Sequence, residues 1–178
     1  EKVRRLKEVG VGRINHNLNT SRRHHPEIVK THTFDDRVAT IESVKAAGVS
    51  TCSGGIIGMG QSDEDIIDLA LTLRAMDIDS IPVNFLHSIP KTPFEQKREL
   101  TPQKCLKTLC LFRFVNPSKE IRVAGGREVN LRSLQPLSLY PANSIFVNGY
   151  LTTPGQEASD AHQMIADLGF ELDQPAAI

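Results

Sequence analysis

The stretch STCSGGIIGMGQS, residues 50–62, decides how the fold is read, because it places a cysteine between an apolar segment and a glycine-rich turn. Before it, residues 34–48 carry apolar side chains at helical spacing and end in Gly48, a residue typical of helix C-termini. After it, Ser62 opens an acidic first turn, and a second helical apolar pattern follows. We therefore expect Cys52 at the carboxyl end of a short strand between two helices, where α/β folds keep their functional groups.

The same order of helix and strand recurs along the whole chain. The predicted pairs are helix 1–9 with strand 11–17, helix 34–47 with strand 49–56, helix 64–76 with strand 80–86, helix 102–115 with strand 120–124, and helix 127–137 with strand 144–147. Alternating strands and helices predict a parallel sheet with right-handed crossovers. We expect an α/β fold of about five parallel βα units, whose first and last strands leave unpaired edges.

Composition excludes several classes of protein. The 21 basic and 21 acidic residues leave no net charge that would favour binding to nucleic acid. No apolar run approaches the roughly 18 residues of a membrane span. Three cysteines cannot all pair, so we expect a reducing, cytoplasmic environment. The chain opens in what reads as the end of a helix, and we expect it to be part of a longer protein.

Polar residues gather at the same end of successive predicted strands. They are Asn15, His16, Asn17, Asn19, Cys52, Asn84, Arg122, Arg127, Asn143 and Ser144. A buried polar group without a partner costs roughly 1–3 kcal/mol. Their concentration favours a polar cavity that holds a ligand, although an interior of mutually satisfied polar layers is the alternative.

Cys52 is open to three interpretations. It could be an inert core thiol, a nucleophile with His16 as its base, or a metal ligand that needs further partners. Cys105 and Cys110 lie on one predicted helix, and we interpret them as core or surface thiols. The chain has no CxxC motif, so a cluster on Cys52 would need ligands from outside it.

Two further patterns give weaker signals. The run GGIIGMG lacks the GxGxxG spacing of dinucleotide sites, but Ile56 within it could offer a flat apolar contact to an aromatic ring. The histidines His24, His25 and His32 lie beside two arginines, and we expect a solvated loop there rather than a zinc site.

Six segments closely resemble the biotin synthase family of radical S-adenosylmethionine (SAM) enzymes. They are NHNLNTS, THTFDDR, TCSGGIIGMGQ, IPVNFLHSIPKTP, KEIRVAGGREVNLRSLQP and ANSIFVNGYLTTPGQ, and the likeness covers about residues 7–170. The resemblance implies a partial TIM-type (β/α) barrel. Residues 1–170 would be the C-terminal portion of a radical SAM (β/α)8 barrel with the biotin and thiamin synthesis associated region, and residues 171–178 a tail. The CxxxCxxC loop that holds the family's [4Fe–4S] cluster would lie upstream.

The resemblance also assigns roles at a second iron–sulfur cluster. Cys52 matches the last cysteine ligand of the family's [2Fe–2S] centre, and Arg122 matches its unusual arginine ligand. Both would be metal ligands and catalytic residues. The family reaction uses a radical made from SAM to abstract hydrogen from dethiobiotin, and sulfur from the [2Fe–2S] centre then closes the ring of biotin.

Four other residues match small-molecule contacts of the family. Asn17 and Asn84 match asparagines that line the dethiobiotin site, whereas Asn19 and Ile56 match positions that contact SAM. The family further implies an electron donor such as flavodoxin or ferredoxin, and a homodimer.

The sequence departs from the family pattern at several positions. Gln61 replaces the usual glutamate, Ile14 a common tyrosine, Lys91 a usual glycine, and residues 148–149 read Asn-Gly where Gly-Asp is expected. A related radical enzyme of the methylornithine-synthase or hydrogenase-maturation type is one alternative, although those generally lack the pair of Cys52 and Arg122. The other alternative is a binding remnant without turnover, because the [4Fe–4S] motif is absent from this chain.

Overall fold

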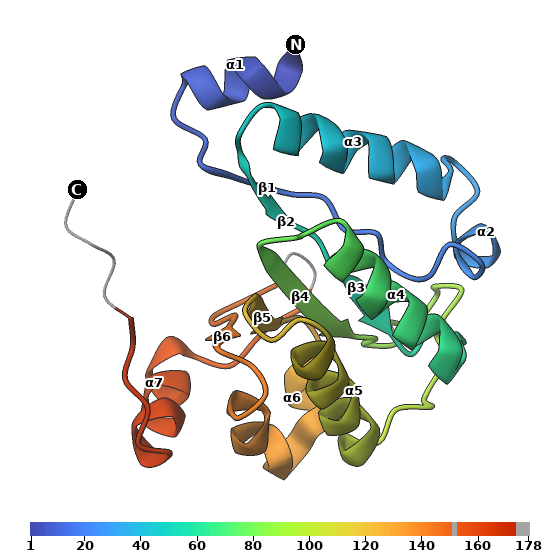
Figure 1. Ribbon diagram of the computed structural model, residues 1–178. Coiled ribbons are helices and arrows are strands. Elements are labelled where there is room, and N and C mark those ends of the chain that lie inside the picture. The colour runs from blue at the N-terminus through green and yellow to red at the C-terminus, as the bar shows by residue number, and fades with distance from the viewer. Residues whose placement is uncertain (151–152, 174–178) are drawn as a thin grey trace.

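Short strands and amphipathic helices alternate in the computed structural model, which describes residues 1–150 and 153–173 (Figure 1). The elements in chain order are α1 (Lys2–Glu8), β1 (Arg13–Asn15), α2 (His25–Ile28), α3 (Phe34–Ala46), β2 (Ser50–Cys52), β3 (Gly55–Ile57), α4 (Asp63–Ala75), β4 (Ser80–Phe85), α5 (Pro102–Val115), β5 (Glu120–Val123), α6 (Arg127–Leu131), the 3-10 helix η1 (Arg132–Leu139), β6 (Ser144–Ile145) and α7 (Ala158–Asp167). Among these, no helix has both the length and the apolar character needed to cross a membrane.

All strand pairs of the sheet are parallel, as the sequence predicts. The strand order is β1-β2-β4-β5-β6, with β3 paired to β4 beside this path. Within the described residues, β1 and β6 therefore end the sheet, which confirms the two expected edges. The result is an open α/β arc that fits part of a TIM-type barrel.

Several elements differ from the prediction. The expected strand 49–56 is split into β2 and β3, because the backbone at Gly54 presses on β4: a Cβ there would lie 1.9 Å from the Pro82 carbonyl oxygen. The expected helix 127–137 ends early and continues as η1, which contains Pro136. The helices α2 and α7 were not predicted. Of the expected tail, residues 171–173 have no regular structure and 174–178 lie outside the described residues.

The helix-facing side of the sheet forms the hydrophobic core. On β4, Ile81, Val83 and Phe85 are at most 2% exposed and pack with apolar residues of α3, α4 and α5. In Figure 1 these helices lie along one side of the strands. Because successive side chains of a strand point to opposite faces, residues 80, 82 and 84 must face the other way. That second face holds the candidate site.

Candidate functional site

The face of the sheet opposite the helices is lined with polar side chains. Strand alternation assigns to it Arg13 and Asn15 of β1, Ser50 and Cys52 of β2, Ser80, Pro82 and Asn84 of β4, Glu120 and Arg122 of β5, and Ser144 of β6. The register pairs Cys52 with both Asn15 and Ser80, so a single level of the sheet brings these three residues together.

Cys52 is buried, with 5% of its surface exposed, and its sulfur accepts a hydrogen bond of 3.1 Å from Asn15 Nδ2. The backbone N–H of His16 donates to the Cys52 carbonyl oxygen, which belongs to the sheet ladder. In the part of the chain that the structure describes, the His16 ring makes no hydrogen bond with the thiol. The geometry thus supports a packed thiol or a ligand, and does not form the nucleophile–base pair.

The Ser80 hydroxyl lies beside Cys52 in the sheet register and has no hydrogen-bond partner among the described residues. It is fully buried, although buried hydroxyls nearly always find a partner. Its register neighbours are Cys52 on β2 and Glu120 on β5. An unpaired buried donor at this level fits a bound electron-rich group between the two strands.

Arg122 reaches the same face from β5. Its Nε donates to Glu120 Oε1 over 2.8 Å, its Nη2 contacts the same oxygen, and its guanidinium lies 5.2 Å from the centre of the Phe146 ring. Burial alone would raise the pKa of Glu120, but Arg122 and Arg13 bring it below its ordinary value. Glu120 is therefore ionised at neutral pH, and it holds the arginine side chain in place.

A hollow of about 630 Å³ opens at the carboxyl ends of the strands. Asn17, Asn84 and His87 are among the residues that line it. Gly54 N–H donates to Asn17 Oδ1 over 3.0 Å, while Asn84 donates to the Gly55 carbonyl and accepts from Gly125 N–H. An amide has two donors and two lone pairs, so each asparagine keeps capacity for a ligand.

The other side chains that line the hollow are largely apolar. They are Ile56, Pro82, Leu86, Ile89, Phe146 and Tyr150. The Tyr150 hydroxyl donates to Glu128 over 3.1 Å, and burial, with the charge of Glu128, raises its pKa to about 12. A small molecule with a polar head and a hydrocarbon part would match the polar and the apolar side chains of this lining.

Asn19 and Ile56 are joined through the backbone. Asn19 has a left-handed conformation, with φ 73°, which asparagine tolerates better than most residues. Its N–H donates to Gly54 O over 3.0 Å, and its carbonyl accepts from Ile56 N–H over 2.8 Å. Any Cβ on Gly55 would lie 2.8 Å from the Asn19 carbonyl oxygen, so the glycine permits this close approach.

Arg127 is not among the residues that line the hollow, although it was one of the polar candidate residues in the sequence. It is fully buried and donates to the side chains of Gln135 and Gln156 and to the Phe146 carbonyl. Its role here is to fasten the segment that carries Phe146 and Tyr150.

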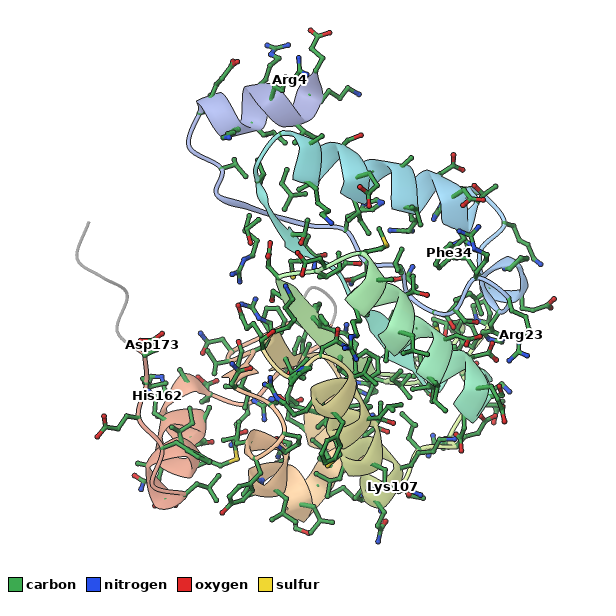
Figure 2. All side chains as sticks on the ribbon, in the orientation of Figure 1. Arg4, Arg23, Phe34, Lys107, His162 and Asp173 are labelled. Carbon is green, nitrogen blue, oxygen red and sulfur yellow. The ribbon has the colours of Figure 1, made fainter. Side chains whose placement is uncertain are left out.

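A basic cluster near α2 corrects the expected solvated loop. His25 is only 1% exposed, its Nε2 has no partner within the described residues, and its ring lies 5.6 Å from that of His32. Arg37 Nε contacts His32 Nε2 over 2.9 Å. Burial, followed by the charges of Arg37 and His32, lowers the pKa of His16. Figure 2 shows Arg23 and Phe34 at this end of the molecule.

The sequence reasoning missed Arg37 as a candidate, because its position in a helical apolar pattern indicated only an exposed turn of α3. The available signal was its place in THTFDDR, one of the segments with family likeness. A guanidinium beside the His32 and His25 imidazoles suits a carboxylate or another small anion.

The remaining cysteines behave as expected. Cys105 is buried on α5, where burial raises its pKa to about 12, and Cys110 is exposed. Within the described ranges, no group of three or more His, Cys, Asp or Glu side chains is placed to hold a metal ion. A metal site on this chain would therefore depend on Cys52 with a different kind of partner, or on residues from elsewhere.

Comparison with known proteins identifies two family models. That of the Biotin and Thiamin Synthesis associated domain matches residues 82–171, just over half of the chain, and that of the Radical SAM superfamily matches residues 1–73. Among similar solved structures are methylornithine synthase, with a TM-score of 0.80 and 17% identity over 97% of this chain and 55% of that one, and a FeFe-hydrogenase maturase from Carboxydothermus hydrogenoformans, with a TM-score of 0.76 and 17% identity over 94% of this chain and 44% of that one. At such identity they support the fold alone.

Much closer in sequence are proteins named biotin synthase. That of Geobacillus kaustophilus (strain HTA426) is 64% identical and that of Bacillus subtilis (strain 168) 62% identical, each over 173 residues, which are 97% of this chain and 52% of the relative. The chain thus spans about half the length of these curated relatives. The chain belongs to the family of the Biotin and Thiamin Synthesis associated domain.

Proposed function

We propose that this chain forms the C-terminal part of a biotin synthase, which inserts sulfur into dethiobiotin with the help of SAM. Relatives of that name match nearly all of the chain at more than 60% identity. The observation that carries the proposal is the level of the sheet where buried Cys52 adjoins the orphaned Ser80 hydroxyl, with Arg122 on the next strand of the same face.

These residues fit one side of a [2Fe–2S] cluster. The Cys52 thiolate would bind iron, and a nitrogen of Arg122 would be the unusual second ligand. The Asn15 amide donates to the same sulfur, and the Ser80 hydroxyl could donate to a bridging sulfide. One thiol and one guanidinium do not complete a four-ligand site, so the other ligands would come from residues upstream of this chain.

The hollow above this level suits dethiobiotin. Asn17 would bind its cyclic urea through its free amide N–H donors, and Asn84 through its remaining donor and acceptor. Phe146 and Tyr150 would lie against its hydrocarbon part. Asn19 and Ile56 would bind SAM, and the basic cluster around Arg37 could hold the carboxylate of SAM. When bound, SAM supplies the hydrogen-abstracting radical and the cluster supplies the sulfur.

The rest of the assembly follows the same proposal. A CxxxCxxC loop upstream would hold a [4Fe–4S] cluster, and residues 1–170 would close with that part into a (β/α)8 barrel. We propose a homodimer that works in the cytoplasm with flavodoxin or ferredoxin as electron donor. Open sheet edges at β1 and β6 are consistent with strands supplied by a further part of the protein.

The test is turnover by the full-length protein that contains this chain. After anaerobic reconstitution with iron and sulfide, it should form biotin from dethiobiotin only when both SAM and a reductant are present. A Cys110→Ala variant is the matched control, because that thiol is exposed on α5 and should not affect the yield. SAM cleavage without any biotin would assign the chain to another radical enzyme of this barrel class, and neither product would indicate a binding remnant.

A further inference from the structure

Glu120 connects two strands that do not touch each other in the sheet. Arg13 lies on β1 and Glu120 on β5, and the sheet order places β2 and β4 between them. Arg13 Nη1 nevertheless lies 2.8 Å from Glu120 Oε2, so the two side chains meet across the sheet face opposite the helices, hereafter the concave face. The second carboxylate oxygen of Glu120 accepts from Arg122. One carboxylate thereby holds two arginines.

The contact with Glu120 determines which guanidinium nitrogen of Arg122 can still donate a hydrogen bond. Nε and Nη2 both bond to Glu120 Oε1, and the guanidinium lies over the Phe146 ring at 5.2 Å. Among the described residues, Nη1 is the one nitrogen of this side chain that makes no hydrogen bond. A planar guanidinium held along one edge can offer only its remaining nitrogen to a bound group.

The ion pair is more buried than the surface ion pairs of Arg22 and Lys104. The side chains of Arg122 and Glu120 are 22% and 24% exposed, whereas the acidic partners of Arg22 and Lys104 are 73% and 77% exposed. A partly buried pair is screened less by solvent and salt than an exposed one. Its charges therefore act on whatever occupies the face beside it.

We propose that Glu120 is a positioning residue for Arg122: it holds the guanidinium so that Nη1 alone is presented to the [2Fe–2S] cluster, and its negative charge lowers the reduction potential of that cluster. Arg13 offsets part of this charge and keeps the carboxylate on the concave face. The inference rests on the proposed function, because it concerns the ligand set of the same site.

The first test needs no cluster. In the full-length protein freed of iron, the rate at which phenylglyoxal modifies Arg122 is followed by mass spectrometry of its peptide. Glu120→Gln should raise this rate several-fold, because the amide holds the guanidinium less tightly. Glu99→Gln is the charge-matched control, since Glu99 belongs to an exposed ion pair with Lys97, and it should leave the rate unchanged. Equal rates in wild type and Glu120→Gln would overturn the positioning role.

The second test measures the visible spectrum and midpoint potential of the reconstituted [2Fe–2S] centre. Loss of a negative charge favours the reduced cluster, so Glu120→Gln should move the potential upward, whereas Arg13→Gln should move it downward. General loosening of the fold would move both variants in one direction. Potentials unchanged in both variants, or shifted alike, would overturn the electrostatic role; Arg13→Gln also serves if Glu120→Gln does not fold.

The two tests separate this inference from the proposed function. Suppose that the wild-type protein takes up no [2Fe–2S] cluster, but that Arg122 is modified faster in Glu120→Gln. This result would refute the proposed cluster and would still support the contact by which Glu120 positions Arg122. A normal cluster with unchanged modification and potential in the variants would retain the proposed function and refute the role of Glu120.

Discussion

Gln61 occupies a position where the resembling family usually carries glutamate, and its amide makes two hydrogen bonds of opposite kind. Nε2 donates to the Ile56 carbonyl over 2.7 Å, and Oε1 accepts from Met59 N–H over 2.6 Å. The side chain is 8% exposed. An ionised carboxylate could accept from Met59 but could not donate to Ile56, so in this chain the amide suits the local backbone better than the acid.

We therefore expect Gln61→Glu to destabilise the chain by about 1–3 kcal/mol at neutral pH, since it leaves a buried carbonyl unpaired. A protonated glutamate can donate again, so the loss should shrink as the pH falls below about 5. Urea unfolding at pH 8 and pH 4 measures both values. A Gln96→Glu variant is the control, because Gln96 is exposed and its side chain makes no hydrogen bond with the described residues. A penalty that is absent at pH 8, or equal at both pH values, would contradict this role of the amide.

Sequence reasoning at the residue scale succeeded where the chemistry of the side chain determined its place. Cys52, Asn17 and Asn84 could be placed at the ends of strands, and alternation then set their common side. The partners of Arg127 and Glu120 could not be predicted, because they lie on distant segments whose approach depends on the register of the whole sheet.

At the scale of elements, the start of α4 shows how a cap can join two segments. Ser62 and Asp65 form a capping box, and Asp65 also accepts from Ser21 over 2.6 Å and from Arg23 over 3.0 Å. Burial alone would raise the pKa of Asp65, but these hydrogen bonds hold it well below its ordinary range. The carboxylate thus ties α4 to the loop that follows β1.

A folded-state pKa below the unfolded value contributes stability above about pH 4, and this contribution is lost as the pH falls through the folded-state pKa. Asp65→Asn should cost about 1–3 kcal/mol at pH 7, at the lower end because Arg23 is 64% exposed and solvent screens the pair. The variant should also show a weaker loss of stability between pH 5 and pH 2 than the wild type. Thermal unfolding across this range checks both; identical pH profiles would contradict it.

The elements themselves were predicted well where hydrophobic periodicity was strong. Helices α3, α4 and α5 each follow an N-cap residue of a typical kind: Thr33, Ser62 and Thr101, respectively. The break between β2 and β3 was missed because it comes from tertiary contact of Gly54 with β4. Helix α7 was missed because its N-cap residue, Glu157, makes no side-chain cap hydrogen bond and is not a typical N-cap residue.

At the scale of the molecule, the open edges of the sheet govern behaviour in solution. The edge strands β1 and β6 leave backbone groups available for pairing, and such edges promote association. We expect the 178-residue chain alone to associate in size-exclusion chromatography with light scattering. Ile145→Lys on β6 should reduce association without changing the circular dichroism spectrum, because a charge on an edge opposes pairing. A compact, cooperatively unfolding monomer in the wild type would count against this prediction.

In the proposed function, the concave face supplies part of an iron–sulfur site through Cys52. The two interpretations of this thiol predict different results: loss of a packed core sulfur would cost about 1–2 kcal/mol by analogy with small core truncations and leave iron content unchanged. Loss of a ligand would remove the cluster, because no neighbouring neutral group replaces a thiolate on iron.

The most direct measurement is therefore iron, sulfide and biotin per molecule in the reconstituted full-length protein, compared among wild type, Cys52→Ala and Cys110→Ala. We expect Cys52→Ala to lose the [2Fe–2S] absorption, the matching iron and sulfide, and biotin formation. SAM cleavage should persist in this variant, and Cys110→Ala should remain like the wild type. Wild-type iron content in Cys52→Ala, with biotin still formed, would contradict it.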